Sequence, residues 1–117
     1  MNREILSSEM LAPNALSFVS SFHQNVVREV SFAVASNKIV VVGMSQNPVV
    51  GKARKALKAA SIDFKYLEYG SYFSQWKPRL AIKLWSGWPT YPQVFIGGKL
   101  IGGFKELEQE LAAGNIK

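Results

Sequence analysis

Few residues of this 117-residue sequence belong to the types that perform covalent chemistry. The sequence contains no cysteine and a single histidine, His23. Without thiols, both a disulfide and thiolate coordination of a metal are excluded. One histidine does not make a typical zinc site, so no metal and no required cofactor are expected. His23 falls in a segment that we expect to be helical, and we interpret it as a surface or half-buried residue.

The loop before a predicted helix contains a candidate nucleophile, Ser45, and a candidate helix cap, Asn47. A serine nucleophile needs a base to activate it, and the only imidazole belongs to another predicted element. Asn47 is well placed to cap the helix that begins at Pro48. The N–H groups at such a helix end could also hold an anion. The residues alone leave both interpretations of Asn47 open, a cap only or part of an anion site.

The stretch that the other elements must position runs from Trp88 to Gly103. Val94–Ile96 and Leu100–Ile101 are short runs of β-branched and apolar residues, which predict two strands. Gly97–Gly98 supplies the positive φ angles that a two-residue hairpin requires. Pro92 comes just before the first strand, where its missing N–H is tolerated and a cis peptide bond is permitted.

Hydrophobic periodicity places the remaining elements. The expected elements are a helix from Asn14 to Ser36, with Asn14 as its N-cap, a strand over 39–42, a helix from Pro48 to Ala60, a strand over 63–69, a helix over 72–84, the hairpin, and a helix over 104–113. A helix between the first two strands indicates that they are parallel. We expect one domain over 1–117, with residues 1–13 as a loose N-terminal arm.

The composition is that of a globular domain, with 48% hydrophobic and 19% charged residues. No apolar run approaches the roughly 18 residues that span a bilayer, and the N-terminus does not resemble a secretory signal. We therefore expect an intracellular, cytoplasmic protein without a membrane partner. The net charge of +6 is spread along the chain, which favours a solvated basic surface over a nucleic-acid site.

The segment from Thr90 to Gly103 resembles the second half of a glutaredoxin, and Trp88–Pro89 before it resembles the W-P-T-x-P variant of the monothiol branch. The resemblance covers roughly residues 39–111. It implies a thioredoxin-like α/β fold, a three-layer α/β/α sandwich around a mixed four-stranded sheet. It also implies the family's connection to thiol chemistry and cell redox homeostasis.

Carried over by position, the family's active-site motif falls on Asn47, Pro48, Val49 and Val50. An amide cannot form a thiolate, attack a disulfide or ligate an iron–sulfur cluster, so the family's own redox reaction is not expected. The resemblance assigns ligand binding to the following residues: Arg79, Tyr91, Pro92, Gly102, Gly103, Phe104 and Lys105.

Two departures weaken the expected glutathione groove. The family's lysine before the active-site motif is replaced by Met44, and its aspartate after the glycine pair is replaced by Lys105. A lysine there repels the γ-glutamyl ammonium, and losing one charged contact costs about 1.5–3 kcal/mol. Glutathione is therefore expected to bind weakly, and another anion or a protein segment is an alternative ligand.

Three functions remain open. The first is a cysteine-less binding module that keeps a glutathione-type groove. The second is a transferase-like enzyme that activates the thiol of bound glutathione at the helix end near Ser45 and Asn47. The third is a structural or oligomeric partner subunit that uses a dense aromatic cluster. The sequence does not separate core from interface for Trp76, Trp85 and Trp88.

Overall fold

The computed structural model describes residues 8–10 and 12–116 of the chain. Its centre is a four-stranded mixed sheet in the order β2-β1-β3-β4. The strands are β1 (Ile39–Gly43), β2 (Lys65–Glu68), β3 (Gln93–Ile96) and β4 (Lys99–Gly102). β1 pairs with β2 in parallel and with β3 in antiparallel register, and β3 pairs antiparallel with β4.

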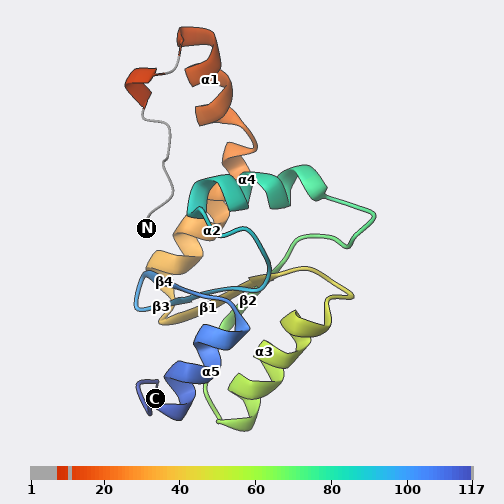
Figure 1. The fold of residues 1–117 in the computed structure, drawn as a ribbon, viewed down its shortest axis with the longest axis vertical. Helices are drawn as coiled ribbons and strands as arrows, with labels where there is room; N and C mark the ends of the chain where they lie inside the picture. Colours follow the sequence, from red (N-terminus) through yellow and green to blue (C-terminus); the bar gives the residue numbers. More distant parts are fainter. Residues whose placement is uncertain (1–7, 11, 117) are drawn as a thin grey trace.

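Helices cover both faces of the sheet (Figure 1). α2 (Gln24–Ser36) and α4 (Trp76–Ser86) lie on one face, and α3 (Pro48–Ala59) and α5 (Phe104–Ala112) lie on the other. This arrangement confirms the three-layer α/β/α fold, and the parallel pairing of β1 with β2 around α3 confirms the predicted β-α-β connection.

Alternation along β1 divides the core into two halves, because successive side chains of a strand point to opposite faces. Val40 and Val42 belong to the cluster that packs under α2 and α4. Ile39 and Val41 belong to the cluster that packs under α3 and α5. All five residues of β1 are buried, as expected for a strand covered on both sides.

The predicted single helix over 14–36 is wrong. The chain instead forms α1 (Pro13–Ser21) and α2, separated at His23, which adopts the left-handed conformation with φ 45°. The apolar spacing runs through the break because periodicity records which face is apolar, and it does not record whether the backbone stays helical. Asn14 is not the N-cap either, since α1 begins at Pro13 after Ala12.

The helix predicted over 72–84 begins later, at Trp76. The hydroxyl of Ser74 accepts a hydrogen bond from the N–H of Ser71, and the hydroxyl of Ser71 accepts one from the N–H of Phe73. Such side-chain bonds to the backbone compete with a helical turn and delay its start. The second strand is likewise shorter than predicted, covering Lys65–Glu68.

The hairpin agrees with its prediction. Gly97 and Gly98 have φ values of 58° and 81° between β3 and β4. Of the predicted N-terminal arm, residues 1–7 and 11 lie outside the described residues, while Ser8–Met10 form a 3-10 turn. No helix of the described residues is long and apolar enough to cross a membrane.

The core assignment predicts a large difference between two leucines in helices. Leu57 of α3 is fully buried, whereas Leu84 of α4 is 64% exposed. Leu57→Ala should lower the free energy of unfolding by about 2–5 kcal/mol because it leaves a cavity. Leu84→Ala serves as the matched control and should change it by less than about 0.5 kcal/mol. Urea unfolding measures both, and similar losses would contradict the assignment.

Candidate functional site

Three segments that are distant in the sequence meet at one end of the sheet. β1 ends at Gly43 and leads into the loop before α3, and Val42 pairs with Gln93 at the start of β3. The end of β4 pairs with the same region, since Gly102 lies opposite Val94. The sheet register therefore brings the loop that contains Asn47 to the same end as the segments 91–92 and 102–103.

Asn47 caps α3 with its own side chain. Its Oδ1 accepts hydrogen bonds from the backbone N–H groups of Val49 at 2.9 Å and Val50 at 3.2 Å. These are two of the N–H groups that a helix leaves without a partner inside the helix. The amide oxygen thus occupies donors at the helix end that would otherwise be available to an anion.

The other three positions of the active-site motif form the start of α3. Pro48 is the first residue of α3, where its missing N–H is harmless. Val49 is 40% exposed. Val50 is buried against Gly43, where a Cβ atom would lie only 2.6 Å from a Val50 methyl carbon. The fourth motif position therefore belongs to the core.

Ser45 is engaged in the fold rather than paired with a base. Its N–H and its hydroxyl both donate to the carbonyl oxygen of Gly70, at 2.7 and 3.1 Å. His23 lies at the junction of α1 and α2, with its ring 4.8 Å from that of Phe22. The structure gives Ser45 an anchoring contact between two loops and shows no arrangement typical of a serine nucleophile.

Tyr91 and Pro92 form a buried corner before β3, and the peptide bond between them is cis. The Tyr91 hydroxyl donates to the main-chain oxygen of Arg79 at 2.6 Å. Burial raises the pKa of the Tyr91 phenol well above its usual value, while the nearby Arg79 charge opposes this shift. The phenol is therefore a neutral donor that fixes α4 to this corner.

Gly102 and Gly103 bring the end of β4 against the same corner. A Cβ on Gly103 would lie 3.4 Å from the carbonyl oxygen of Pro92 and 3.6 Å from Nε1 of Trp88. Gly102 has a φ of 126°, and a Cβ there would lie 2.7 Å from the Glu106 side chain. Gly102 requires the lack of a side chain, because of its positive φ and the nearby Glu106, whereas a Cβ on Gly103 would make only ordinary van der Waals contacts.

Glu106 is a site residue that the sequence reasoning missed. Its Oε1 accepts from the N–H of Gly103 at 2.8 Å, as in a capping box at the start of α5. A carboxylate three residues after an N-cap is a recognisable signal in the sequence. It places a negative charge in the turn where Lys105, which is exposed, brings a positive one.

Two buried polar atoms near this corner have no hydrogen-bond partner within residues 8–10 and 12–116, Nε1 of Trp88 and Oε1 of Gln93. Gln93 is fully buried, and its Nε2 donates to the carbonyl oxygen of Trp88 at 3.0 Å. Buried polar atoms usually have a partner in the protein or in ordered water. The sequence prediction did not include either residue among the site residues.

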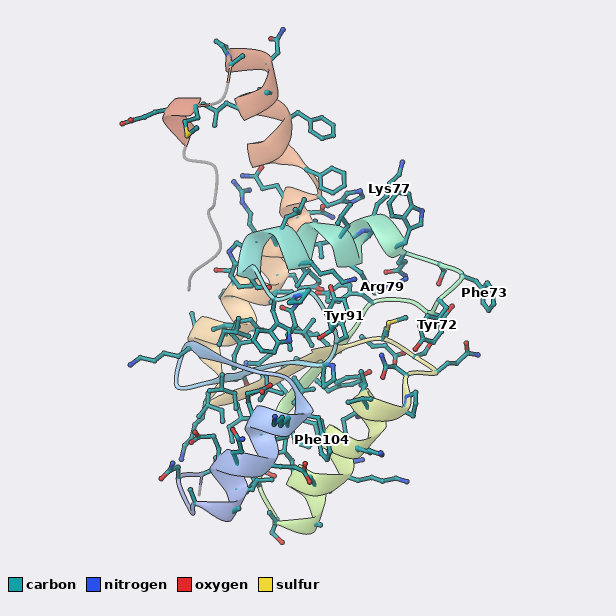
Figure 2. All side chains as sticks on the ribbon, in the orientation of Figure 1. Tyr72, Phe73, Lys77, Arg79, Tyr91 and Phe104 are labelled. Carbon is teal, nitrogen blue, oxygen red and sulfur yellow. The ribbon has the colours of Figure 1, made fainter. Side chains whose placement is uncertain are left out.

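Arg79 does not extend freely from α4. The residue is only 7% exposed, and its Nη1 donates to the main-chain oxygen atoms of Tyr69 and Ser74. Figure 2 shows Arg79 and Tyr91 between α4 and the sheet. The guanidinium therefore holds the β2–α4 loop, and any carboxylate ligand would share it with these two carbonyl groups.

The two remaining predicted residues, Phe104 and Lys105, are consecutive residues in the first turn of α5. Phe104 is half-buried and packs against the core cluster that contains Leu107. Lys105 is exposed to solvent. Met44, at the position of the family's lysine, is 6% exposed and belongs to the other core cluster, so it contributes no charge to the site.

The predicted aromatic cluster, which covers the aromatic residues from Tyr69 to Tyr91, is divided between core and surface. Tyr69 and Tyr91 are buried, and Trp88 is half-buried beside the glycine pair. Trp76 is 60% exposed and Trp85 is 41% exposed.

A separate pocket of about 520 Å³ lies at the opposite end of the parallel strand pair, between α3 and β2. Its lining includes Arg54, Lys58 and Asp63, and the Arg54 guanidinium stacks 3.9 Å above the Tyr66 ring. Burial, and then the neighbouring carboxylate of Glu68, raise the pKa of Tyr66 to about 12. None of the predicted site residues lines this pocket.

Comparison with known proteins agrees with this geometry. The family model for glutaredoxin matches residues 39–101. The chain is 47% identical to a glutaredoxin-like protein of Dictyostelium discoideum over 98% of this chain and 92% of that protein. It is 30% identical to glutaredoxin 4 of Buchnera aphidicola over 80% of this chain and 89% of that protein.

Solved structures support the fold. A wheat glutaredoxin has a TM-score of 0.68 at 27% identity, covering 80% of this chain and 86% of that one. A buckwheat glutaredoxin, solved as a complex with glutathione, has a TM-score of 0.66 at 23% identity, covering 78% and 83%.

The capping role of Asn47 can be measured directly. Asn47→Ala removes the acceptor of two helix N–H groups and should lower the free energy of unfolding by about 1 kcal/mol. Asn47→Asp is the matched control, since it keeps an acceptor at the same position and should retain most of the stability. Equal losses in the two variants, measured by urea unfolding, would contradict the capping role.

The buried tyrosines predict an alkaline loss of stability. Because the folded state holds the Tyr91 proton more tightly, the unfolded state loses that proton first as the pH rises above about 10. The free energy of unfolding should then fall by about 1.4 kcal/mol per pH unit for each such tyrosine. Tyr91→Phe should make this slope shallower, and so should Tyr69→Phe, because burial also raises the pKa of Tyr69. An unchanged slope in both variants would be evidence against this assignment.

Proposed function

The chain belongs to the glutaredoxin family, and from this premise we propose that it is a binding module without thiol–disulfide chemistry of its own. Its ligand is glutathione or a closely related γ-glutamyl peptide, held weakly in the groove between Asn47, Tyr91–Pro92 and Gly102–Gly103. We propose an intracellular, cytoplasmic location, as expected from the sequence.

The loss of chemistry follows from the residue types. Thiol–disulfide exchange requires an attacking thiolate, and a protein-held iron–sulfur cluster requires thiolate ligands. The chain has no cysteine to provide either. The helix end that would stabilise a thiolate is instead capped by the Asn47 amide oxygen.

The observation that carries the binding proposal is the contact between the glycine pair and the corner before β3. Gly103 lies next to the Pro92 carbonyl, since a Cβ on Gly103 would lie 3.4 Å from that oxygen, an ordinary van der Waals contact. Neighbouring polar atoms on Trp88 and Gln93 have no partner among the described residues. Because these atoms are buried, ordered water would give them the hydrogen bonds that buried groups usually make, and a bound peptide would reach them only through that water.

The charges around the glycine pair explain why we propose weak binding. Lys105 repels the ammonium of a γ-glutamyl group, whereas the carboxylate of Glu106 in the same turn attracts it. Glu106 already accepts the Gly103 N–H, so only part of its capacity remains for a ligand. For the glycine carboxylate of glutathione, the proposal relies on the guanidinium N–H groups of Arg79 other than those that bond the loop.

A transferase-like enzyme has less support. Its thiolate would have to be stabilised at the end of α3, where Asn47 already accepts from two N–H groups. Ser45, the other candidate, donates its hydroxyl to Gly70. We therefore give the binding module precedence.

The test is a titration of the isotope-labelled protein with reduced glutathione, monitored by amide chemical shifts. Shifts should cluster at the segments 91–94 and 102–106. Lys105→Asp should strengthen binding by about tenfold to a hundredfold, because it replaces a repulsive charge with an attractive one. Lys99→Asp is the matched control: it makes the same change of charge on β4, at an exposed position.

Two outcomes would overturn the proposal. The first is an absence of shifts at millimolar glutathione in both the parent protein and Lys105→Asp. The second is turnover of glutathione with a generic electrophile that Asn47→Ala abolishes, which would favour the transferase-like enzyme.

A further inference from the structure

Three aromatic side chains form an exposed tip next to the sheet end that contains the site. Tyr72 is 58% exposed, Phe73 is 93% exposed, and Trp76 at the start of α4 is 60% exposed. Figure 2 shows Tyr72 and Phe73 on the loop that projects beyond the first turn of α4. We refer to Tyr72, Phe73, Trp76 and the adjacent Lys77 as the aromatic tip.

Packing within the domain does not account for these rings. None of them belongs to either core cluster of the described residues. The loop that carries them is nevertheless held in place, because Ser71 and Ser74 bond to each other's backbone and Arg79 donates to the oxygen of Ser74. The fold therefore presents apolar rings to solvent on an ordered turn, which is typical of an interaction surface.

The chain segment that carries the aromatic tip has only basic charged residues, while Glu29 of α2 accepts from the hydroxyl of Tyr69 before the loop. The sequence has no aspartate or glutamate between Glu68 and Glu106. Lys77 is exposed, and its Nζ lies 5.7 Å from the centre of the Trp76 ring. The opposite face of the sheet carries charges of both signs, with three glutamates on α5 and four basic residues on α3. A partner at the aromatic tip is therefore expected to be anionic.

We propose that the aromatic tip docks on the surface of an anionic lipid bilayer. The rings lie at the end of a projecting loop, so the surface is convex. A convex surface can insert between lipid headgroups, whereas it cannot enclose a side chain of a partner protein. Tryptophan and tyrosine favour the membrane–water interface, and an adjacent lysine attracts anionic headgroups. The exposed Leu80 and Leu84 continue from Trp76 at four-residue spacing along the same helix.

This contact departs from the expectation from the sequence, which was a protein without a membrane partner. The sequence argument concerned segments that span a bilayer, and no described helix is able to do so. Peripheral binding requires only a few inserted apolar side chains together with basic residues. The residues of the aromatic tip are not part of the proposed ligand groove, so the proposal does not depend on the proposed ligand.

The experiment is co-sedimentation of the full chain with phosphatidylcholine vesicles, with and without phosphatidylserine, at low and high salt. We expect binding only to the vesicles that contain phosphatidylserine, and weaker binding at high salt. Phe73→Ser should lower the partition coefficient by about fivefold, since it removes an inserted ring. Lys77→Glu should lower it by about fivefold or more. Both positions are exposed, so neither change should affect folding.

Lys52→Glu is the control, because it makes the same change of charge at an exposed position of α3, on the other face of the sheet. It should leave the partition coefficient unchanged. Three results would overturn the proposal. The first is that sedimentation does not depend on phosphatidylserine. The second is that Lys52→Glu and Lys77→Glu lower the partition coefficient equally while Phe73→Ser does not lower it. The third is sedimentation without vesicles that Phe73→Ser abolishes. The last result would identify the aromatic tip as a contact between copies of the chain.

Discussion

The complete burial of β1 is the constraint on which the rest of the structure depends. This strand pairs on both sides, in parallel with β2 and antiparallel with β3, and its alternate side chains enter the two halves of the core. A strand buried on both faces requires helices on both faces, which α2 with α4 and α3 with α5 provide. Because β1 ends beside the start of β3, the same pairing also determines where the site is located.

At that end of the sheet the protein keeps a helix terminus but changes its chemistry. A helix N-terminus stabilises negative charge, and in the glutaredoxin family this is where the reactive thiolate is expected. In this chain the Asn47 amide oxygen accepts the available hydrogen bonds while remaining uncharged. Asn47 therefore caps α3 without providing a nucleophile.

The distribution of exposed aromatic side chains gives the molecule two different sides. The acid-free segment from Tyr69 to Lys105 includes all of α4, and it carries most of the exposed large aromatic side chains among the described residues. The opposite face carries the glutamates of α5 together with the basic residues of α3. Such an asymmetry does not stabilise the fold, because exposed rings contribute little to the core. It is therefore more informative about partners than about folding.

The sequence by itself determined the fold class, the hairpin at Gly97–Gly98 and the absence of thiol chemistry. The hairpin and the absence of thiol chemistry depend on local residue type, and the fold class depends on the order of the elements and on the resemblance to the family. Only the tertiary structure decided that the helix breaks at His23 and that Arg79 bonds the β2–α4 loop, whereas the contact of Glu106 with Gly103 follows a local spacing that the sequence shows. It also separated the buried Tyr69 and Tyr91 from the exposed Tyr72 and Trp76. The physical reason is that hydrophobic spacing reports which face of an element is apolar, whereas burial and hydrogen-bond partners depend on which other element covers that face.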